Sequence, residues 1–174
     1  MMSGGFPRFA ITFDIGIRTC TRGDLDALEW FGLFTEHREL IHRAFQRQEH
    51  GEVVMLLADA NGFPVGQTWI DLVAKADLSI GVLWAVRVFP IFRRKGIGTR
   101  LLHAAETVLR RRGFARAEIG VEKDNHDARR LYERLGYRLA GEERSAYTYT
   151  TPDGVPMRIP VDEWLLRKRL KAAY

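Results

Sequence analysis

The sequence predicts an α/β fold with a mixed, mostly antiparallel sheet of about seven strands and helices on both faces. Three observations lead to this prediction. Stretches with alternating apolar residues, typical of half-buried strands, recur among stretches with helical spacing. A strand–helix–strand unit at 78–121 requires one parallel pair of strands. The last two strand patterns are joined by a turn sequence, which is typical of an antiparallel pair.

Length and composition favour one domain. The chain has 174 residues, of which 46% are hydrophobic, which is sufficient for one buried core. No repeat, low-complexity stretch or linker divides it. We therefore expect residues 1–174 to form a single domain, with residues 1–7 as a disordered tail.

The charge balance favours an anionic partner. Twenty-seven Lys and Arg residues against 22 Asp and Glu residues give a net charge of +5, which suits an anionic ligand, a membrane surface or a nucleic acid. The single cysteine, Cys20, excludes an internal disulfide and a zinc cluster, and no metal site is expected. No apolar stretch reaches the roughly eighteen residues that span a bilayer. We therefore expect a cytoplasmic protein without membrane contact.

The first half of the chain begins with a strictly alternating strand pattern at 8–20, where Cys20 is expected to pack. Thr21 and Asp24 resemble a capping box at the start of a helical run. Asn61 and Gly62 mark a tight turn between two apolar stretches, which indicates a hairpin. The expected elements are a strand at 8–20, helical runs at 25–32 and 40–51, and strands at 53–58 and 65–73.

The second half contains the strand–helix–strand unit, whose two strands should be parallel with a right-handed crossover. On its helix, Ile97, Leu101 and Ala105 form the buried stripe, and Glu106 is expected outside. The terminal strand would offer an exposed edge for a homodimer. The expected elements are strands at 78–89 and 115–121 around a helix at 96–112, a helix at 125–135, and strands at 137–150 and 155–168.

A basic turn between the strand and the helix predicts an oligophosphate site. Arg93, Arg94 and Lys95 are consecutive cations, and Gly96 and Gly98 let the backbone approach a large anion closely. The first turn of a helix also leaves four N–H groups unsatisfied and carries about half a positive charge. A pyrophosphate is the ligand that this combination fits best.

Two familiar phosphate loops are excluded by the glycine spacing. A P-loop needs Lys-Ser/Thr after its last glycine, and a dinucleotide fingerprint needs a glycine where Leu101 stands. The stretch from Arg93 to Gly98 instead reads Arg-x-x-Gly-x-Gly, which resembles the acyl-coenzyme A motif of the GNAT superfamily of N-acetyltransferases. A second GNAT signature is matched about thirty residues later at Asn125, Ala128, Leu131, Tyr132, Gly136 and Tyr137.

The resemblance implies where acetyl-coenzyme A, the co-substrate, would bind. In this fold the parallel strands around 78–89 and 115–121 splay apart, and the pantetheine arm pairs with main-chain groups in the gap. The pyrophosphate would lie on the N–H groups that open the helix, and an Asn side chain would contact the cofactor. The residues expected to bind the cofactor are Val86, Val88, Arg93, Arg94, Lys95, Gly96, Ile97, Gly98, Thr99 and Asn125.

Two residues of the second signature, Asn125 and Tyr132, could have structural roles instead of functional ones. Asn125 is well placed to cap the helix that follows it. Tyr132 lies seven residues further, on the same helix face, where it would cover the core edge. The resemblance implies that Tyr132 is catalytic: its phenol, with a reference pKa of about 10, would protonate the departing thiolate.

The expected function is therefore transfer of an acetyl group from acetyl-coenzyme A to a primary amine, by direct attack in a ternary complex. The acceptor, a small-molecule or peptide amine, is not identified. Trp84, Trp30 and Phe34 are candidates for an aromatic acceptor floor, or simply for the core. A non-catalytic acyl-coenzyme A sensor and a basic nucleic-acid module at 110–116 are the alternatives. The basic residues lack an interleaved aromatic stacking platform, so we expect no nucleic acid.

The general base is missing from both positions where relatives carry an acid. This chain has Val82 at the first position and Gly120 at the second. An ordered water chain could also accept the proton of the amine. The remaining candidates are Asp71, Glu118, Glu122 and His126.

Overall fold

The computed structural model describes residues 11–151 and 153–171. The expected tail at 1–7 lies outside these ranges, as does the beginning of the strand predicted at 8–20. Its described part is shorter than expected, because β1 spans only Ile15–Thr19. Its partner β2 ends at Ala60, opposite Ile15, so residues 11–14 have no ladder to join.

The predicted mixed sheet is confirmed, with seven strands in the order β1-β2-β3-β4-β5-β7-β6. Every neighbouring pair is antiparallel except β4 and β5, which are parallel. The terminal strand β7 lies inside the sheet, so the prediction that it forms an exposed edge is wrong, and β6 is the edge. The other strands are β2 (Val53–Ala60), β3 (Phe63–Lys75), β4 (Ile80–Val88), β5 (Arg116–Glu122), β6 (Arg138–Thr150) and β7 (Pro156–Arg169).

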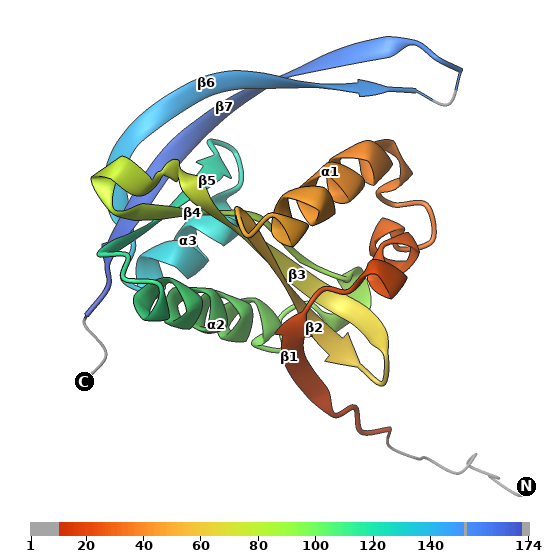
Figure 1. The fold of residues 1–174 in the computed structure, drawn as a ribbon, viewed down its shortest axis with the longest axis horizontal. Coiled ribbons are helices and arrows are strands. Elements are labelled where there is room, and N and C mark those ends of the chain that lie inside the picture. Colours follow the sequence, from red (N-terminus) through yellow and green to blue (C-terminus); the bar gives the residue numbers. More distant parts are fainter. Residues whose placement is uncertain (1–10, 152, 172–174) are drawn as a thin grey trace, which may run out of the picture.

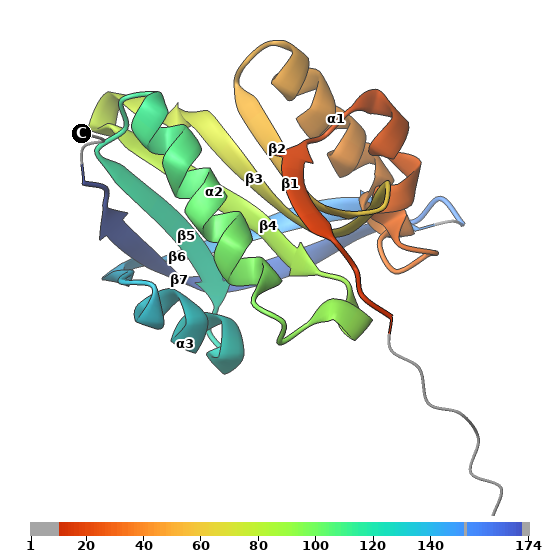
Figure 2. The same cartoon turned by 90° about the horizontal axis from the view of Figure 1, so that it is seen from below.

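Helices cover both faces of the sheet, as predicted. Helix α1 (Arg38–Glu49) lies on one face, and α2 (Ile97–Arg111) and α3 (His126–Arg134) lie on the other (Figures 1 and 2). The helical run expected at 25–32 instead forms short 3-10 helices at Arg22–Asp24 and Asp26–Glu29. It ends where Trp30 and Phe31 adopt positive φ angles of 45° and 57°, which an α-helix cannot accommodate.

Each face has its own apolar core. The larger cluster joins α2 and α3 to the sheet and includes Leu101, Ile119 and Tyr137. The smaller cluster joins α1 to the opposite face through Ile41 and Trp69. The two layers allow the sheet to present different chemistry on its two faces.

Two buried carboxylates lie where the sequence did not lead us to expect them. Glu106 was expected on the outside of its helix but is only 2% exposed, because the end of β7 covers it. Lys168 Nζ lies 2.8 Å from both of its carboxylate oxygens, and the Tyr137 hydroxyl donates to Oε1 at 3.1 Å. Glu118 is 1% exposed and is ion-paired to Lys75 and to Arg167.

The β4–β5 ladder is short, and this opens the sheet. Its Cα pairs run only from Ile80 with Arg116 to Leu83 with Ile119. Immediately afterwards Ala85 has a φ of 51°, and the β3–β4 register shifts between Gln67 and Trp69. This is a β-bulge, which bends β4 away from its neighbour. The predicted splay of the two parallel strands is confirmed.

Within residues 11–151 and 153–171, no helix has the length and apolar character needed to cross a bilayer.

We predict that Glu118→Gln lowers the free energy of unfolding by about 3 kcal/mol, because two cations then face one another without a counter-ion. For a chain of this size the melting temperature should fall by roughly 6–12 °C. Differential scanning calorimetry measures this. The control is Glu122→Gln on the same strand, which is exposed and should change stability by less than about 0.5 kcal/mol. Equal melting temperatures for the two variants would contradict the role of Glu118.

Candidate functional site

A groove of about 680 Å³ runs between the start of α2 and the outer face of α3. We call it the α2–α3 groove. Basic side chains line it on both sides, and the start of α2 that borders it has N–H groups outside the helical hydrogen bonds, so its chemistry suits an anion. Its lining residues are Val88, Phe92, Arg93, Arg94, Gly96, Ile97, Gly98, Thr99, Asp127, Arg130, Leu131 and Arg134.

The turn before α2 directs its N–H groups into this groove. Arg94 and Gly96 have positive φ angles of 60° and 80°, which reverse the chain between β4 and the helix. The Arg93 side chain holds the end of β4 by donating from Nε to the Val88 carbonyl at 3.1 Å. The first helical hydrogen bond runs from the Arg100 N–H to the Gly96 carbonyl. The N–H groups before Arg100 therefore have no helical carbonyl to bond to.

The groove contains seven of the ten residues predicted to bind the cofactor, from Val88 to Thr99 without Lys95. Lys95 is exposed, and Val86 packs against the core of the α2 face. Asn125 caps α3, since its Oδ1 accepts from the Ala128 N–H at 3.1 Å. For all ten residues, contact with the cofactor stays a prediction.

Helix α3 supplies groove residues that sequence reasoning missed. Asp127, Arg130, Leu131 and Arg134 are spaced by three, four and seven residues and therefore share one helix face. Their shared face is visible in the sequence spacing, but the functional candidates predicted on this helix, Asn125 and Tyr132, came from the resemblance alone. Arg130 and Asp127 form an ion pair on this face.

Tyr132 lies on the inner side of α3. It is 5% exposed, and its ring centroid lies 6.2 Å from that of Tyr137. It is absent from the groove lining. Burial, with a contribution from the nearby Glu163 charge, raises the pKa of the phenol above 10. The hydroxyl is therefore protonated at neutral pH, as a proton donor must be, and its catalytic role stays a prediction.

Glu163 occupies the space that the missing side chain of residue 120 would fill. A Cβ placed on Gly120 would lie 2.7 Å from Glu163 Oε2. Glu163 is also the centre of an acidic row across three strands, since it pairs with Glu122 on β5 and with Glu143 on β6. Burial and these two like charges raise the pKa of the Glu163 carboxyl. The sequence signal that could have identified Glu163 is its position as an acidic residue among the apolar residues of the strand predicted at 155–168.

The other candidate bases differ in whether an ion pair or a hydrogen bond already occupies them. Asp71 is ion-paired with Arg47 at 2.8 Å and accepts two backbone N–H groups, and Glu118 is buried between two cations. Glu122 and His126 are exposed. Within the described ranges none of Glu163, Glu122 and Glu143 forms an ion pair, so all three carboxylates of the acidic row lack a counter-ion there.

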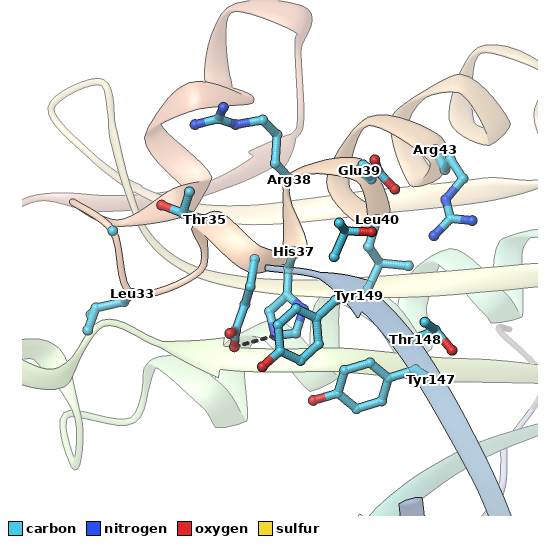
Figure 3. A pocket seen from close by; sticks show the side chains of 13 residues that line it. Leu33, Thr35, His37, Arg38, Glu39, Leu40, Arg43, Tyr147, Thr148 and Tyr149 are labelled. Carbon is cyan, nitrogen blue, oxygen red and sulfur yellow. Dashed lines mark ion pairs between the residues drawn. The ribbon is translucent and has the colours of Figure 1, made fainter. Parts of the chain in front are cut away.

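A second cavity, of about 510 Å³, lies between the start of α1 and β6, and we call it the α1–β6 pocket (Figure 3). Tyr147 and Tyr149 extend from β6 toward His37, which is 3.8 Å from the Glu36 carboxylate. Burial lowers the pKa of His37, favouring neutral imidazole. The lining residues are Gly32, Leu33, Thr35, Glu36, His37, Arg38, Glu39, Leu40, Arg43, Tyr147, Thr148, Tyr149 and Thr150.

The three aromatic residues proposed for an acceptor floor have separate positions. Trp30 is buried, and its indole N–H donates to the Pro64 carbonyl at 2.7 Å, so it belongs to the core. Phe34 stacks on His37 at 5.7 Å, which places it behind the α1–β6 pocket. Trp84 packs edge to face on Trp69, with centroids 4.6 Å apart.

Comparison with known proteins gives consistent matches. The acetyltransferase (GNAT) family model matches residues 23–137. The uncharacterized N-acetyltransferase YhfO of Bacillus subtilis is 32% identical over 124 residues, which cover 64% of this chain and 83% of that protein.

Two solved structures show the same fold at low identity. The ribosomal-protein-S18-alanine N-acetyltransferase of Escherichia coli has a TM-score of 0.68 at 22% identity, covering 92% of this chain and 97% of that one. The putative acetyltransferase yncA of Salmonella typhimurium, solved with acetyl-CoA, has a TM-score of 0.68 at 20% identity, covering 91% and 95%.

We predict that Gly98→Ala weakens coenzyme A binding at least about tenfold, because the added methyl group stands where the backbone should meet the diphosphate. The fold should be unaffected, since a Cβ there would be 3.7 Å from Leu131 Cδ2, an ordinary contact. Isothermal titration calorimetry measures the affinity. In the contrasting variant Gly81→Ala the new Cβ would lie 2.0 Å from Leu109, so stability should fall instead. Unchanged affinity in Gly98→Ala would contradict the site.

Proposed function

Because the chain belongs to the acetyltransferase (GNAT) family, we propose that it transfers an acetyl group from acetyl-coenzyme A to a primary amine, which attacks directly in a ternary complex. One observation carries this proposal: the anion-binding start of α2 stands at the mouth of the gap where β4 and β5 separate. A diphosphate and a linear arm extending from it fit this arrangement.

The residues present suit acetyl-coenzyme A, which would supply an activated acetyl thioester. Arg93 and Arg94 provide charge for the diphosphate, and the N–H groups of Gly96 to Thr99 provide donors. Beyond Leu83, β4 has no partner on its β5 side, so the main chain near Val86 and Val88 is free to pair with an extended arm. The yncA neighbour solved with acetyl-CoA supports this assignment.

Glu163 is the base that we assign to the amine. Its carboxylate lies against Gly120, beside the separation of β4 and β5, and carries no counter-ion in the described part of the chain. A carboxyl with a raised pKa accepts a proton more readily than an ordinary glutamate. An incoming ammonium group would give one proton to Glu163 and attack as the free amine.

Tyr132 is the acid that we assign to the leaving thiolate. Its phenol holds its proton at neutral pH, and Glu163 contributes to its electrostatic surroundings from across the sheet. The two groups therefore serve opposite ends of one transfer: Glu163 accepts a proton from nitrogen, and Tyr132 Oη donates one to sulfur.

We predict that an amine-library screen that follows thiol release from acetyl-coenzyme A identifies an acceptor for the wild-type protein. With this acceptor, Tyr132→Phe should lower kcat by about 10²–10⁴, because the proton donor is lost, and leave coenzyme A affinity unchanged. Tyr137→Phe is the matched control. It removes a buried hydroxyl bonded to Glu106, so it should reduce stability rather than kcat. Wild-type kcat in Tyr132→Phe would overturn the assignment.

We predict that kcat/KM rises with pH through the pKa of Glu163, which lies above the ordinary value of about 4.3. In Glu163→Gln only the free-amine fraction reacts, so this limb should move up toward the pKa of the acceptor amine. In Glu143→Gln a like charge disappears, so the pKa of Glu163 falls and the limb should move to lower pH. Rate–pH profiles of the three proteins measure these shifts. An unmoved limb in Glu163→Gln would exclude Glu163 as the base.

A further inference from the structure

Three buried N–H donors on the α1 face of the sheet have no acceptor among the described residues: Gln67 Nε2, Trp84 Nε1 and Arg87 Nη1. The β3–β4 register pairs Gln67 with Arg87 and Trp69 with Trp84. Because residues two apart on a strand share a face, these adjacent pairs point to the same side. Trp69 and Trp84 pack with residues of α1, which identifies that side as the α1 face.

The orientation of the Gln67 amide is fixed by its neighbour. The Trp69 indole N–H donates to Gln67 Oε1 at 2.8 Å. The NH₂ group of the same amide is therefore the part of the side chain that lacks a partner among the described residues. Turning the amide would place two donors against each other. Gln67 Oε1 makes no hydrogen bond to Arg87, although the two residues are directly opposite, and Arg87 Nη1 is left without an acceptor among the described residues.

Arg87 is a cation without a counter-ion. The Phe34 ring lies 4.3 Å from its guanidinium carbon, and this cation–π contact is its clearest partner. Glu36 and Tyr147 act on it electrostatically, but no ion pair with a carboxylate forms in the described part of the chain. A guanidinium cannot lose its charge in a protein, and burying it beside unmatched donors is unfavourable. The site is complete only when an anion is added.

The position of Arg87 determines the face of the sheet on which this anion would bind. Arg87 lies between Val86 and Val88, whose side chains pack toward α2, so its own side chain is on the opposite face of the sheet. Its electrostatic neighbours Glu36 and Tyr147 line the α1–β6 pocket. The anion would therefore bind on the side of β4 away from the α2–α3 groove.

We propose, on the premise of the proposed function, that the acceptor is an amino acid whose free carboxylate binds the donors of Arg87, Trp84 and Gln67. A planar carboxylate matches the forked guanidinium, with the indole and amide N–H groups as further donors. The ammonium group of the same molecule suits the acidic row centred on Glu163. The α1 face of the sheet thus offers a zwitterion one unpaired guanidinium and a row of three carboxylates.

The first test compares amino acids with their carboxamides, which keep the amine and the shape but lose the negative charge. The wild-type protein should favour the best free amino acid over its amide by at least about 100-fold in kcat/KM. In the presence of coenzyme A, that amino acid should raise the melting temperature and its amide should not. Equal or better use of amides, peptide N-termini or polyamines would overturn the inference and leave acetyl transfer intact.

The second test changes the donors one at a time. Trp84→Phe keeps the ring but removes one N–H, and the preference for the carboxylate should fall about tenfold. Gln67→Glu places a carboxylate opposite Arg87 within the protein. It should raise the melting temperature and abolish the preference, because the cation is then neutralised internally. A lower melting temperature in Gln67→Glu would show that Arg87 does not lack an anion and would overturn the inference.

Failure of the proposed function has a different signature. If no amine releases thiol while coenzyme A binds and amino acids still raise the melting temperature, acetyl transfer is wrong and the carboxylate site remains. If amino acids have no effect on melting temperature or rate, the carboxylate site is wrong, whichever amine is acetylated.

Discussion

The early end of the β4–β5 ladder is the constraint on which the rest of the structure depends. Only four Cα pairs join the two strands, and the bulge at Ala85 follows directly. Backbone groups left without a partner inside a sheet must find another, because unpaired buried N–H and C=O groups are unfavourable. The fold therefore contains an incomplete ladder whose natural completion is an extended ligand, and the start of α2 stands beside it.

In the proposed reaction, the two faces of the sheet would serve opposite ends of one transfer. On the α2 face, basic side chains and free N–H groups create an anion site on the surface of an apolar core. The α1 face carries an acidic row and an isolated guanidinium. Under the proposal, this separation of charge across a single sheet would let a cofactor and an acceptor approach from opposite sides without competing for the same groups.

The architecture and the cofactor groove were accessible from the sequence, because they rest on local signals. Alternation, helical spacing and the glycine turn predicted the parallel unit and seven of the twelve residues that line the α2–α3 groove. Glu163, Glu106 and Arg87 were missed, since their surroundings come from strands distant in sequence. The side chain of Glu163 fills the space above Gly120 only because β7 inserts between β5 and β6. A missing acid at one position therefore did not mean a missing acid in the site.

The bulge at Ala85 also decides the face on which Arg87 lies. Trp84 and Arg87 are three residues apart, yet they oppose Trp69 and Gln67, which are two apart. In a regular strand, residues three apart point to opposite faces, and Arg87 would then enter the apolar core around α2. The extra residue turns the cation to the acceptor side instead. A positive φ at alanine is unfavourable by about 1–2 kcal/mol. One irregular residue therefore both leaves main chain of β4 unpaired, where we propose the cofactor, and directs a charge to the face where we propose the acceptor.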